Sequence, residues 1–218
     1  MKNMSKEDYL STIYKLRDDS GEIKPNSIAE SLDISNAAVT DMLKKLSRDD
    51  LIDYKKYRGI KLTKSGELYA KNMVRRHRLW ETFLYKVLDL PWDKIHDEAE
   101  KLEHSSSEQL INRIEEFLKY PEYDPHGYPI PDKKGKLPKT QDLMAASELR
   151  KNEKAKVLRV RDFSSEMLAY IHKIGLRLGQ EITVKNVLEY DGSLQIVINK
   201  KELNISKKIA SNIFVERI

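Results

Sequence analysis

The 218-residue chain contains no cysteine. This absence excludes disulfides, zinc-thiolate sites, iron-sulfur clusters and cysteine nucleophiles, so any metal must be held by oxygen and imidazole ligands. No apolar run approaches the roughly 18 residues that a membrane span needs. The first ten residues, MKNMSKEDYL, show neither a secretory signal nor a transit peptide. The sequence therefore predicts a cytoplasmic protein with no membrane partner.

Charge of either sign is abundant but nearly balanced. Lysine and arginine number 40 against 35 acidic residues, which gives a net charge of +5, and 39% of the residues are hydrophobic. This balance is typical of a soluble globular protein, and the small basic excess is only weak support for a polyanionic partner. The length suits two or three small domains.

Residues 1–64 have the pattern of a winged helix-turn-helix domain. Apolar residues recur at helical spacing from Lys6 to Leu16 and again on both sides of a tight connection at Asp33 to Ser35, where Ser35 is a natural N-cap. The stretch LIDYKKYRGIKL, from Leu51 to Leu62, alternates β-forming residues around a Gly, as in a two-stranded ribbon.

The helix after this turn is the candidate DNA-reading element. Such helices reach base edges with small and polar residues at their N-terminal end. Those residues here are Ser35, Asn36, Ala37, Ala38, Thr40 and Asp41. Basic residues that could meet phosphates follow on the helix and on the wing, namely Lys44, Lys45, Arg48, Lys55, Lys56 and Arg58. The alternative is a solvated helix face beside an ordinary basic hairpin.

The rest of the chain divides into a helical part and a β-rich part. Residues 65–140 predict a long helix to about Leu88, two shorter helices at Trp92 to His104 and Ser107 to Leu118, and a proline-rich loop from Tyr120 to Lys139. Residues 141–155 predict a charged helical linker. In 156–218, short alternating runs and an Asp-Gly hairpin signal predict a small β-barrel-like domain with one helix near Ser165 to His172.

Histidines and carboxylates gather in the helical part at spacings that suit a metal. Four of them fall on one stripe of a helix at i, i+4, i+7 and i+8, namely His96, Glu100, Glu103 and His104. His77 and Glu81 form a second pair at i and i+4, and His126 lies in the proline-rich loop. Any single pair could be a surface ion pair. Six such groups at stacked spacings favour a cage for manganese, iron(II), zinc or nickel.

Five segments in order carry a family resemblance: EDYL, NAAVTDMLKKL, YRGIKLT, VRRHRLWETFL and IHDEAEKLEH. With them the whole chain closely resembles the diphtheria toxin repressor and manganese transport regulator family. The resemblance implies a homodimeric, metal-activated repressor of metal-uptake genes that binds operator DNA. It also implies a mainly α fold with β, in which 1–64 binds DNA, 65–140 binds metal and dimerises, 141–155 is a linker, and 156–218 is SH3-like (FeoA-like).

The same resemblance implies two sets of metal ligands. The primary activating site falls on Asp8, Glu100, Glu103 and His104. The second site falls on His77 and Glu81, with further candidates in His96, His126, Asp124 and Asp162. The Glu and Gln ligands that iron-type members place in the tail domain align only poorly, near Ser164 and Met167, so the resemblance implies no tail-domain ligand beyond Asp162.

The donor atoms indicate which metal the primary site takes. Iron-type members of the family place Met and Cys where this chain has Asp8 and Glu100, so the resemblance implies manganese(II) as cofactor, with iron(II) as the alternative, and no organic cofactor. A two-domain manganese subtype has Glu where this chain has Ser11, so its bridged pair of ions is not expected here.

Two other classes of function compete with this hypothesis. A carboxylate and histidine cage could activate water in a metallohydrolase, but the sequence has no HExxH motif or nucleophile elbow, and the DNA-binding pattern would go unexplained. A metal-independent winged-helix regulator would bind its operator whether or not a chelator is present. The prediction is therefore a regulator and not an enzyme.

Overall fold

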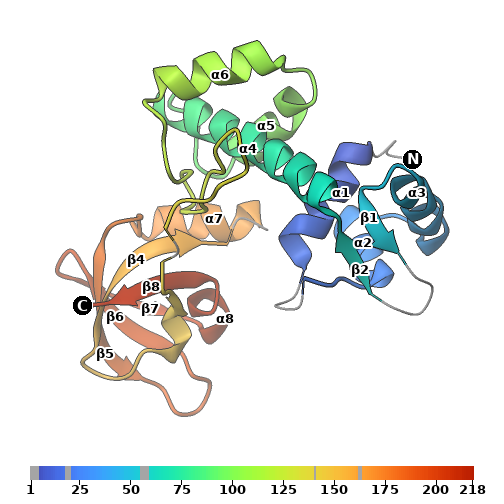
Figure 1. The fold of residues 1–218 in the computed structure, drawn as a ribbon. Helices are drawn as coiled ribbons and strands as arrows, with labels where there is room; N and C mark the ends of the chain where they lie inside the picture. The colour runs from blue at the N-terminus through green and yellow to red at the C-terminus, as the bar shows by residue number, and fades with distance from the viewer. Residues whose placement is uncertain (1–4, 18–20, 55–58, 140, 162–163) are drawn as a thin grey trace. The chain divides into compact units, whose positions relative to one another are not determined.

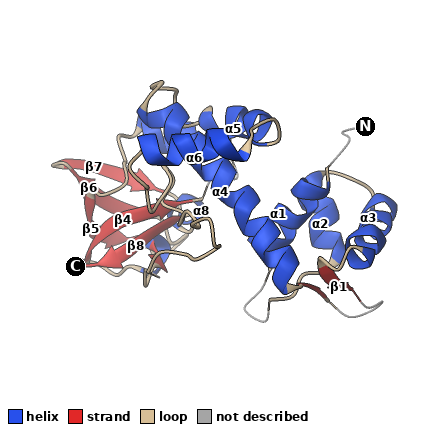
Figure 2. Cartoon of the chain, turned by 45° about the horizontal axis from the view of Figure 1, so that its top comes forward, coloured by secondary structure: helices blue, strands red, loops and turns tan. Residues whose placement is uncertain are grey.

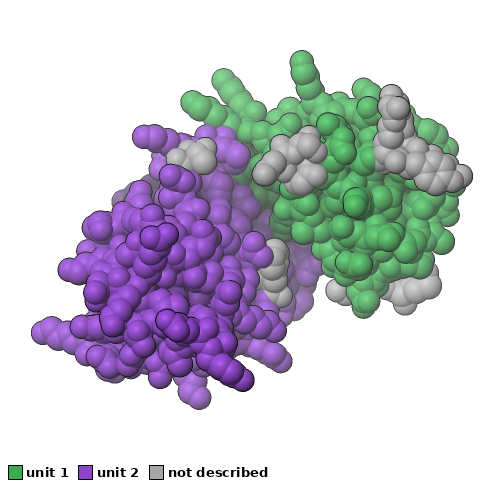
Figure 3. Space-filling view, turned by 90° about the horizontal axis from the view of Figure 1, so that it is seen from below, with its two compact units in different colours: residues 1–76, 131–136 green, residues 77–130, 137–218 purple. Residues whose placement is uncertain are grey.

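The structure, a computed structural model, describes residues 5–17, 21–54, 59–139, 141–161 and 164–218. The chain forms two compact units (Figure 3). The first contains residues 1–76 with 131–136, and the second contains 77–130 with 137–218. None of the described helices combines the length and the apolar character needed to cross a membrane.

The first unit begins as a winged helix-turn-helix (Figure 1). Its elements are α1 (Lys6–Leu16), α2 (Pro25–Leu32), α3 (Asn36–Arg48), β1 (Ile52–Tyr54), β2 (Ile60–Leu62) and the start of α4 (Lys64–Lys86). Ser35 caps α3 by accepting the Ala38 N–H at 3.2 Å. Between α2 and α3 the chain turns at Asp33, whose φ of 52° is one that Asp tolerates. The predicted helix-turn-helix and ribbon are confirmed.

One apolar core holds this first unit together. Leu10, Ile28, Leu43 and Ile60 are fully buried, so α1, α2, α3 and the wing each contribute a side chain. The two wing strands pair antiparallel. At the start of α4, a Cβ on Gly66 would lie 1.8 Å from the Leu51 carbonyl oxygen, so only glycine allows the helix to approach the chain before the wing this closely.

The helical part of the second unit contains the end of α4, α5 (Ile95–Glu103) and α6 (Glu108–Phe117). Its two tryptophans each satisfy the indole N–H while burying the ring. Trp80 donates to the Ser106 hydroxyl at 2.7 Å and Trp92 donates to the Pro125 carbonyl at 3.0 Å. The second bond ties the proline-rich loop to the helical core.

The tail of the second unit is a six-stranded antiparallel sheet, and Figure 2 shows most of the strands gathered there. Its order is β3-β8-β4-β5-β6-β7. The strands are β3 (Met144–Ala145), β4 (Lys154–Val160), β5 (Glu181–Val187), β6 (Leu194–Ile198), β7 (Lys201–Ile205) and β8 (Ile213–Arg217). The short helices are η1 (Ala146–Glu148), α7 (Ser165–Lys173) and α8 (Lys207–Ala210). The predicted hairpin at Asp191-Gly192 and the single longer helix are confirmed.

The helical linker predicted before this sheet is wrong. Instead of a helix, Met144 and Ala145 pair with β8, a single 3₁₀ turn follows, and β4 begins at Lys154. Ala146 and Leu149 are buried in the apolar core of the second unit. Burial of these apolar side chains thus overrides the helix-forming composition of the segment.

Candidate metal centre

Two histidines of the second unit converge on one carboxylate oxygen. His77 Nε2 lies 3.0 Å from Glu81 Oε1, and His96 Nδ1 lies 3.2 Å from the same oxygen and 3.1 Å from His77 Nε2. Ligand atoms bound about 2.1 Å from a tetrahedral metal lie about 3.4 Å apart. A small shift would therefore place these three atoms around one ion.

The other oxygen of Glu81 faces a second group of donors from the proline-rich loop. His126 Nδ1 lies 3.8 Å from Glu81 Oε2, and one ligand atom from each of Glu81, Asp124 and His126 falls within 4.8 Å of the others. Glu81 and His126 are fully buried, and Asp124 is nearly so. Glu81 is thus shared between two candidate cages.

Local structure explains why these residues meet. His77 and Glu81 are one turn apart on α4, so their side chains lie on the same face. His96 and Glu103 come from α5. In the loop, Asp124 Oδ1 accepts the N–H groups of His126 and Tyr128 at 2.8 and 2.9 Å, which folds the chain into a turn around the carboxylate.

Neighbouring side chains fix the ring orientations of the two most buried histidines, His77 and His126. His77 Nδ1 lies 2.6 Å from Glu103 Oε2, a short contact between buried groups that leaves Nε2 directed at Glu81. The Trp92 ring stacks on His126 with centroids 5.2 Å apart and an interplanar angle of 27°. Supports of this kind fix the direction of a ligand before a metal arrives.

Burial and charge act in opposite directions on the two carboxyls. Burial disfavours ionisation of Glu81, but the charge of His77 and the contacts with three histidines outweigh it and hold its pKa well below the usual range. Burial, reinforced by the nearby charge of Glu81, raises the pKa of Asp124 to about 6 despite Arg78. Both carboxyls are therefore mainly ionised at neutral pH, as ligands of a divalent cation must be.

The buried oxygens provide a test of whether a cation fits. Glu81 Oε2 and Asp124 Oδ2 are both inaccessible to solvent and accept no hydrogen bond from the described residues, although Arg78 Nε lies 3.4 Å from Asp124 Oδ2. An ionised oxygen without such a partner is costly in a protein interior. Oxygen and imidazole donors that face one another suit a hard or borderline divalent cation. The residues present therefore fit a metal ion.

The four residues of the predicted primary site lie in different units. Asp8 is in the first unit on α1, where its carboxylate accepts the Ser5 N–H at 2.6 Å in a capping box. Glu100, Glu103 and His104 lie on or directly after α5 in the second unit. There Glu103 is buried beside His77, while Glu100 and His104 are exposed. Joint ligation by the four stays a prediction.

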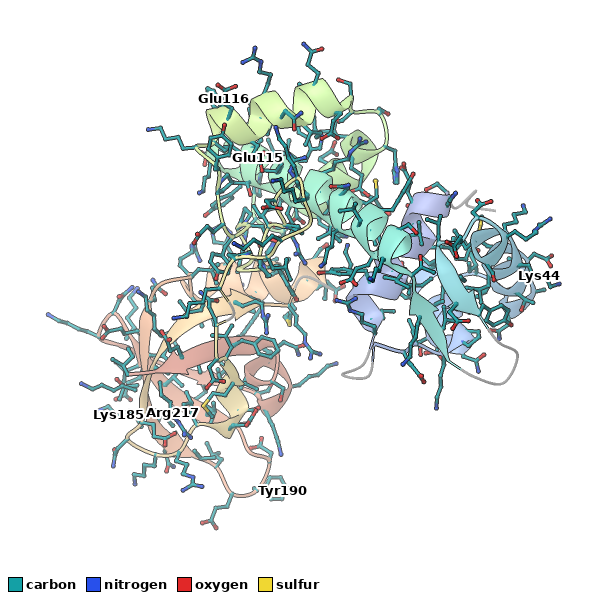
Figure 4. All side chains as sticks on the ribbon, in the orientation of Figure 1. Lys44, Glu115, Glu116, Lys185, Tyr190 and Arg217 are labelled. Atoms are coloured by element: carbon teal, nitrogen blue, oxygen red, sulfur yellow. The ribbon has the colours of Figure 1, made fainter. Side chains whose placement is uncertain are left out.

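The candidate DNA-reading residues that the structure describes lie at the N-cap of α3 or along that helix. Ser35 to Ala38, Asp41, Lys44, Lys45 and Arg48 are exposed at the cap or on α3, and Thr40 is half-buried. Figure 4 shows Lys44 projecting outward from α3. The wing residues Lys55, Lys56 and Arg58, like the tail candidate Asp162, lie outside the described residues.

Sequence reasoning missed two residues that support the centre. Arg78 Nε lies 3.4 Å from Asp124 Oδ2, and its guanidinium donates to the Pro129 carbonyl. Trp92 packs on His126. An Arg directly after a candidate ligand, and a Trp in the turn between two helices, carry no signal of their own. Their roles depend on where the proline-rich loop folds back.

Comparison with family models covers nearly the whole chain. Residues 2–60 match the N-terminal DNA-binding domain of iron-dependent repressors, residues 63–132 match the metal-binding and dimerisation domain of the same repressors, and residues 144–217 match the FeoA domain. The tail sheet described above is therefore the FeoA, or SH3-like, domain.

Individual relatives agree with these matches. The transcriptional regulator MntR of Bacillus subtilis is 38% identical over 124 residues, which are 57% of this chain and 87% of MntR. MntR of Oceanobacillus iheyensis is 38% identical over 120 residues, 55% of this chain and 81% of that protein. A solved manganese-dependent repressor in complex with manganese has a TM-score of 0.89 at 32% identity and covers 98% of this chain and all of its own.

A further solved structure, ScaR with bound Cd²⁺, has a TM-score of 0.83 at 32% identity over 99% of this chain and 100% of its own. Relatives that match the whole length, and family models that account for all three parts of the chain, show one common architecture. The chain belongs to the diphtheria toxin repressor and manganese transport regulator family of metal-dependent transcriptional repressors.

Proposed function

We propose that this protein is a manganese(II)-activated repressor of metal-uptake genes that acts in the cytoplasm. It binds double-stranded operator DNA as a homodimer and catalyses no reaction. The observation that carries the proposal is Glu81, a fully buried carboxylate shared by His77 and His96 on one side and by His126 and Asp124 on the other. The manganese-dependent relatives support the choice of ion.

The proposed mechanism uses three parts of the chain: 1–64 reads DNA, 65–140 binds metal and dimerises, and the tail, whose sheet begins at Met144, is the FeoA-like domain. The activating ligands are Asp8, Glu100, Glu103 and His104. Glu81 and its neighbours form the second site. A cation at the activating site would need ligands from both α1 and the α5 region.

The ligands of the activating site explain why metal and DNA binding should be linked. Asp8 belongs to α1 of the DNA-binding domain, whereas His104 follows α5 directly. Drawing these side chains to one point restricts the orientation of the DNA-binding domain. Because linkage is reciprocal, an ion that favours the DNA-competent state by a given factor is itself bound more tightly by that factor on DNA.

A chelator titration tests this proposal. We expect operator affinity to fall about 100-fold when EDTA removes the ion, equivalent to about 2.7 kcal/mol, and Mn(II) added back should restore it. Anaerobic titrations of the metal-free protein with Mn(II), Fe(II), Co(II), Ni(II) and Zn(II) then identify the activating ion. Equal operator affinity with and without chelator would contradict the proposal, and activation at lower Fe(II) than Mn(II) would favour the iron(II) alternative.

We expect Lys44→Gln to weaken operator binding equally for all sequences. Lys44 is exposed on α3, and among the described residues its ammonium pairs only with Asp41, at 3.3 Å, so it is available to a phosphate. Losing one phosphate contact should reduce the slope of log K against log salt by about 0.9. Fluorescence anisotropy at several salt concentrations measures both effects. Thr40→Val, in contrast, should change base preference and leave the slope unaltered.

An exposed apolar surface supports the proposed dimer. Large apolar side chains are accessible at the end of α4, along α6 and just after it: Val87, Leu88, Leu110, Phe117 and Tyr120. Phe117 is 64% exposed although its ring lies 6.1 Å from that of Phe83. Such a concentration of apolar area on one part of a soluble chain marks a protein interface.

We expect Phe117→Asp to convert the dimer to a monomer and to reduce operator affinity by more than about tenfold, because a charge would have to be buried in the contact. Sedimentation velocity measures the mass and anisotropy the affinity. Glu116→Gln, a change at the exposed neighbour that pairs with Arg113, is the control and should leave the dimer intact. A fully dimeric Phe117→Asp protein would exclude this surface as the interface.

A further inference from the structure

A row of alternating cations and aromatic rings joins the proline-rich loop to the FeoA-like domain. The Tyr128 ring has the Arg78 guanidinium 5.2 Å from its centroid and the Arg159 guanidinium at 5.4 Å. Arg159 also lies over Phe214, at 4.6 Å. Arg78 is on α4, Arg159 on β4 and Phe214 on β8, so one loop residue is contacted by both parts of the second unit.

The backbone of the same loop lies directly on β4. Val160 donates its N–H to the His126 carbonyl at 2.9 Å. Gly127, with φ of 89°, approaches so closely that a Cβ there would lie 2.0 Å from the Leu158 carbonyl oxygen. The loop that carries Asp124 and His126 is therefore in contact with β4 through both its backbone and the Tyr128 ring.

Arg159 is the unusual member of this row. Its Nε is inaccessible to solvent and has no hydrogen-bond partner among the described residues. Burial, together with the like charges of Arg161 and Arg78, lowers its pKa, and Tyr128 and Asp124 only partly offset this. The Arg159 guanidinium is thus held in a buried position mainly by stacking on aromatic rings. Its role there must be something other than charge pairing.

We infer that Arg159 is a positioning residue for the metal centre: by stacking on Tyr128 it clamps the ligand loop against β4, so that the FeoA-like domain holds Asp124 and His126 toward Glu81. The inference rests on the proposed function. Arg159 itself does not contact the ion. The domain affects metal affinity through the loop even where it offers no ligand of its own.

Replacement of Arg159 tests the clamp. We expect Arg159→Met to weaken Mn(II) binding at the Glu81 centre about tenfold, in the range found when a group that supports a ligand is lost. Isothermal titration in a His104→Ala background isolates that centre from the activating site. The matched control is Arg161→Met, because Arg161 is an exposed arginine of the same row and lies over Phe214, with its guanidinium 5.4 Å from the ring centroid. It should bind Mn(II) as the parent does.

Hydrogen exchange in the metal-free protein provides a readout that does not need the ion. The Val160 amide, which donates to His126, should exchange at least about tenfold faster in Arg159→Met and unchanged in Arg161→Met. Amides of the β5–β6 pair report whether the domain stays folded. In Arg159→Met we expect the β5–β6 amides to exchange slowly, as in the parent protein, and the Val160 amide to exchange fast. Equal acceleration throughout the domain would mean a general loss of stability and would overturn the inference.

A double-mutant cycle with Tyr128→Leu shows whether the two residues act as one contact. The double change should weaken Mn(II) binding no more than either single change, because each removes the same clamp. Unchanged affinity in Arg159→Met, or additive losses in the cycle, would overturn the inference. Failure of the parent protein to bind Mn(II) at this centre would contradict the proposed function, and the Val160 amide alone would then decide on the clamp.

Discussion

Glu81→Gln is expected to abolish Mn(II) binding at the centre it shares with His77, His96, Asp124 and His126. The side chain is fully buried, and its two oxygens face different donor groups. The amide keeps the shape but removes the negative charge and presents an NH₂ donor to one of the two groups. Loss of a group that only supports a ligand costs about 10–100-fold, so loss of the shared ligand should cost at least about 100-fold.

The measurement is a Mn(II) titration followed by the electron paramagnetic resonance signal of the free ion. Glu98→Gln is the matched control, because Glu98 is also a helical glutamate near the centre but pairs with Lys101 at 2.8 Å and is half exposed. It should bind as the unmodified protein does. If Glu81→Gln retained full Mn(II) stoichiometry and affinity with an intact circular dichroism spectrum, the Glu81 centre would not be a metal site.

The sequence predicted the elements well where the periodicity of apolar residues is long. In α3, Val39, Leu43 and Leu46 recur on the buried face after an N-cap serine, and both signals agree. The wing and the β5–β6 hairpin were likewise marked by alternation around a glycine. In each case the local pattern and the tertiary packing favour the same structure.

The failures lie where distant packing decides. Nothing local to residues 144–149 indicates that Met144 pairs with Val215 or that Leu149 is buried, since both depend on a strand some seventy residues later. The sequence predicts that four residues of the α5 region share one helix face. In the structure they lie in two different environments. Glu103 and His96 face α4 residues, whereas Glu100 and His104 are exposed. Helical spacing sets which residues share a face and not which of them finds a partner.

The proline-rich loop shows the same limit at the candidate site. Its histidine and aspartate were identified as ligand candidates from the family pattern, and the structure brings Asp124 and His126 to Glu81. Their supports come from more than thirty residues earlier in the chain, Arg78 from α4 and Trp92 from the turn between α4 and α5. Contacts between segments so far apart leave no periodic signal in one sequence.

The second large effect concerns the choice of metal and depends on Asp8 and Glu100. Both offer oxygen donors at positions where iron-type members of the family have thioether and thiolate. Manganese is at the weak end of the Irving-Williams order, so a manganese site must favour hard ligands and a high coordination number over raw affinity. Asp8→Met combined with Glu100→Cys replaces both oxygens with soft donors.

We expect this double variant to lose activation by Mn(II) and to respond to Fe(II), Co(II) or Ni(II), with the order of half-activating concentrations for Mn(II) and Fe(II) reversed. Anaerobic operator binding with each ion measures the order. Glu7→Met with Glu98→Cys is the matched control, since it introduces the same two side chains on α1 and α5 at positions that are not proposed ligands. His104→Ala should remove activation by every ion, because the imidazole is common to both donor sets. If the double variant still preferred Mn(II), Asp8 and Glu100 would not be the residues that select the metal.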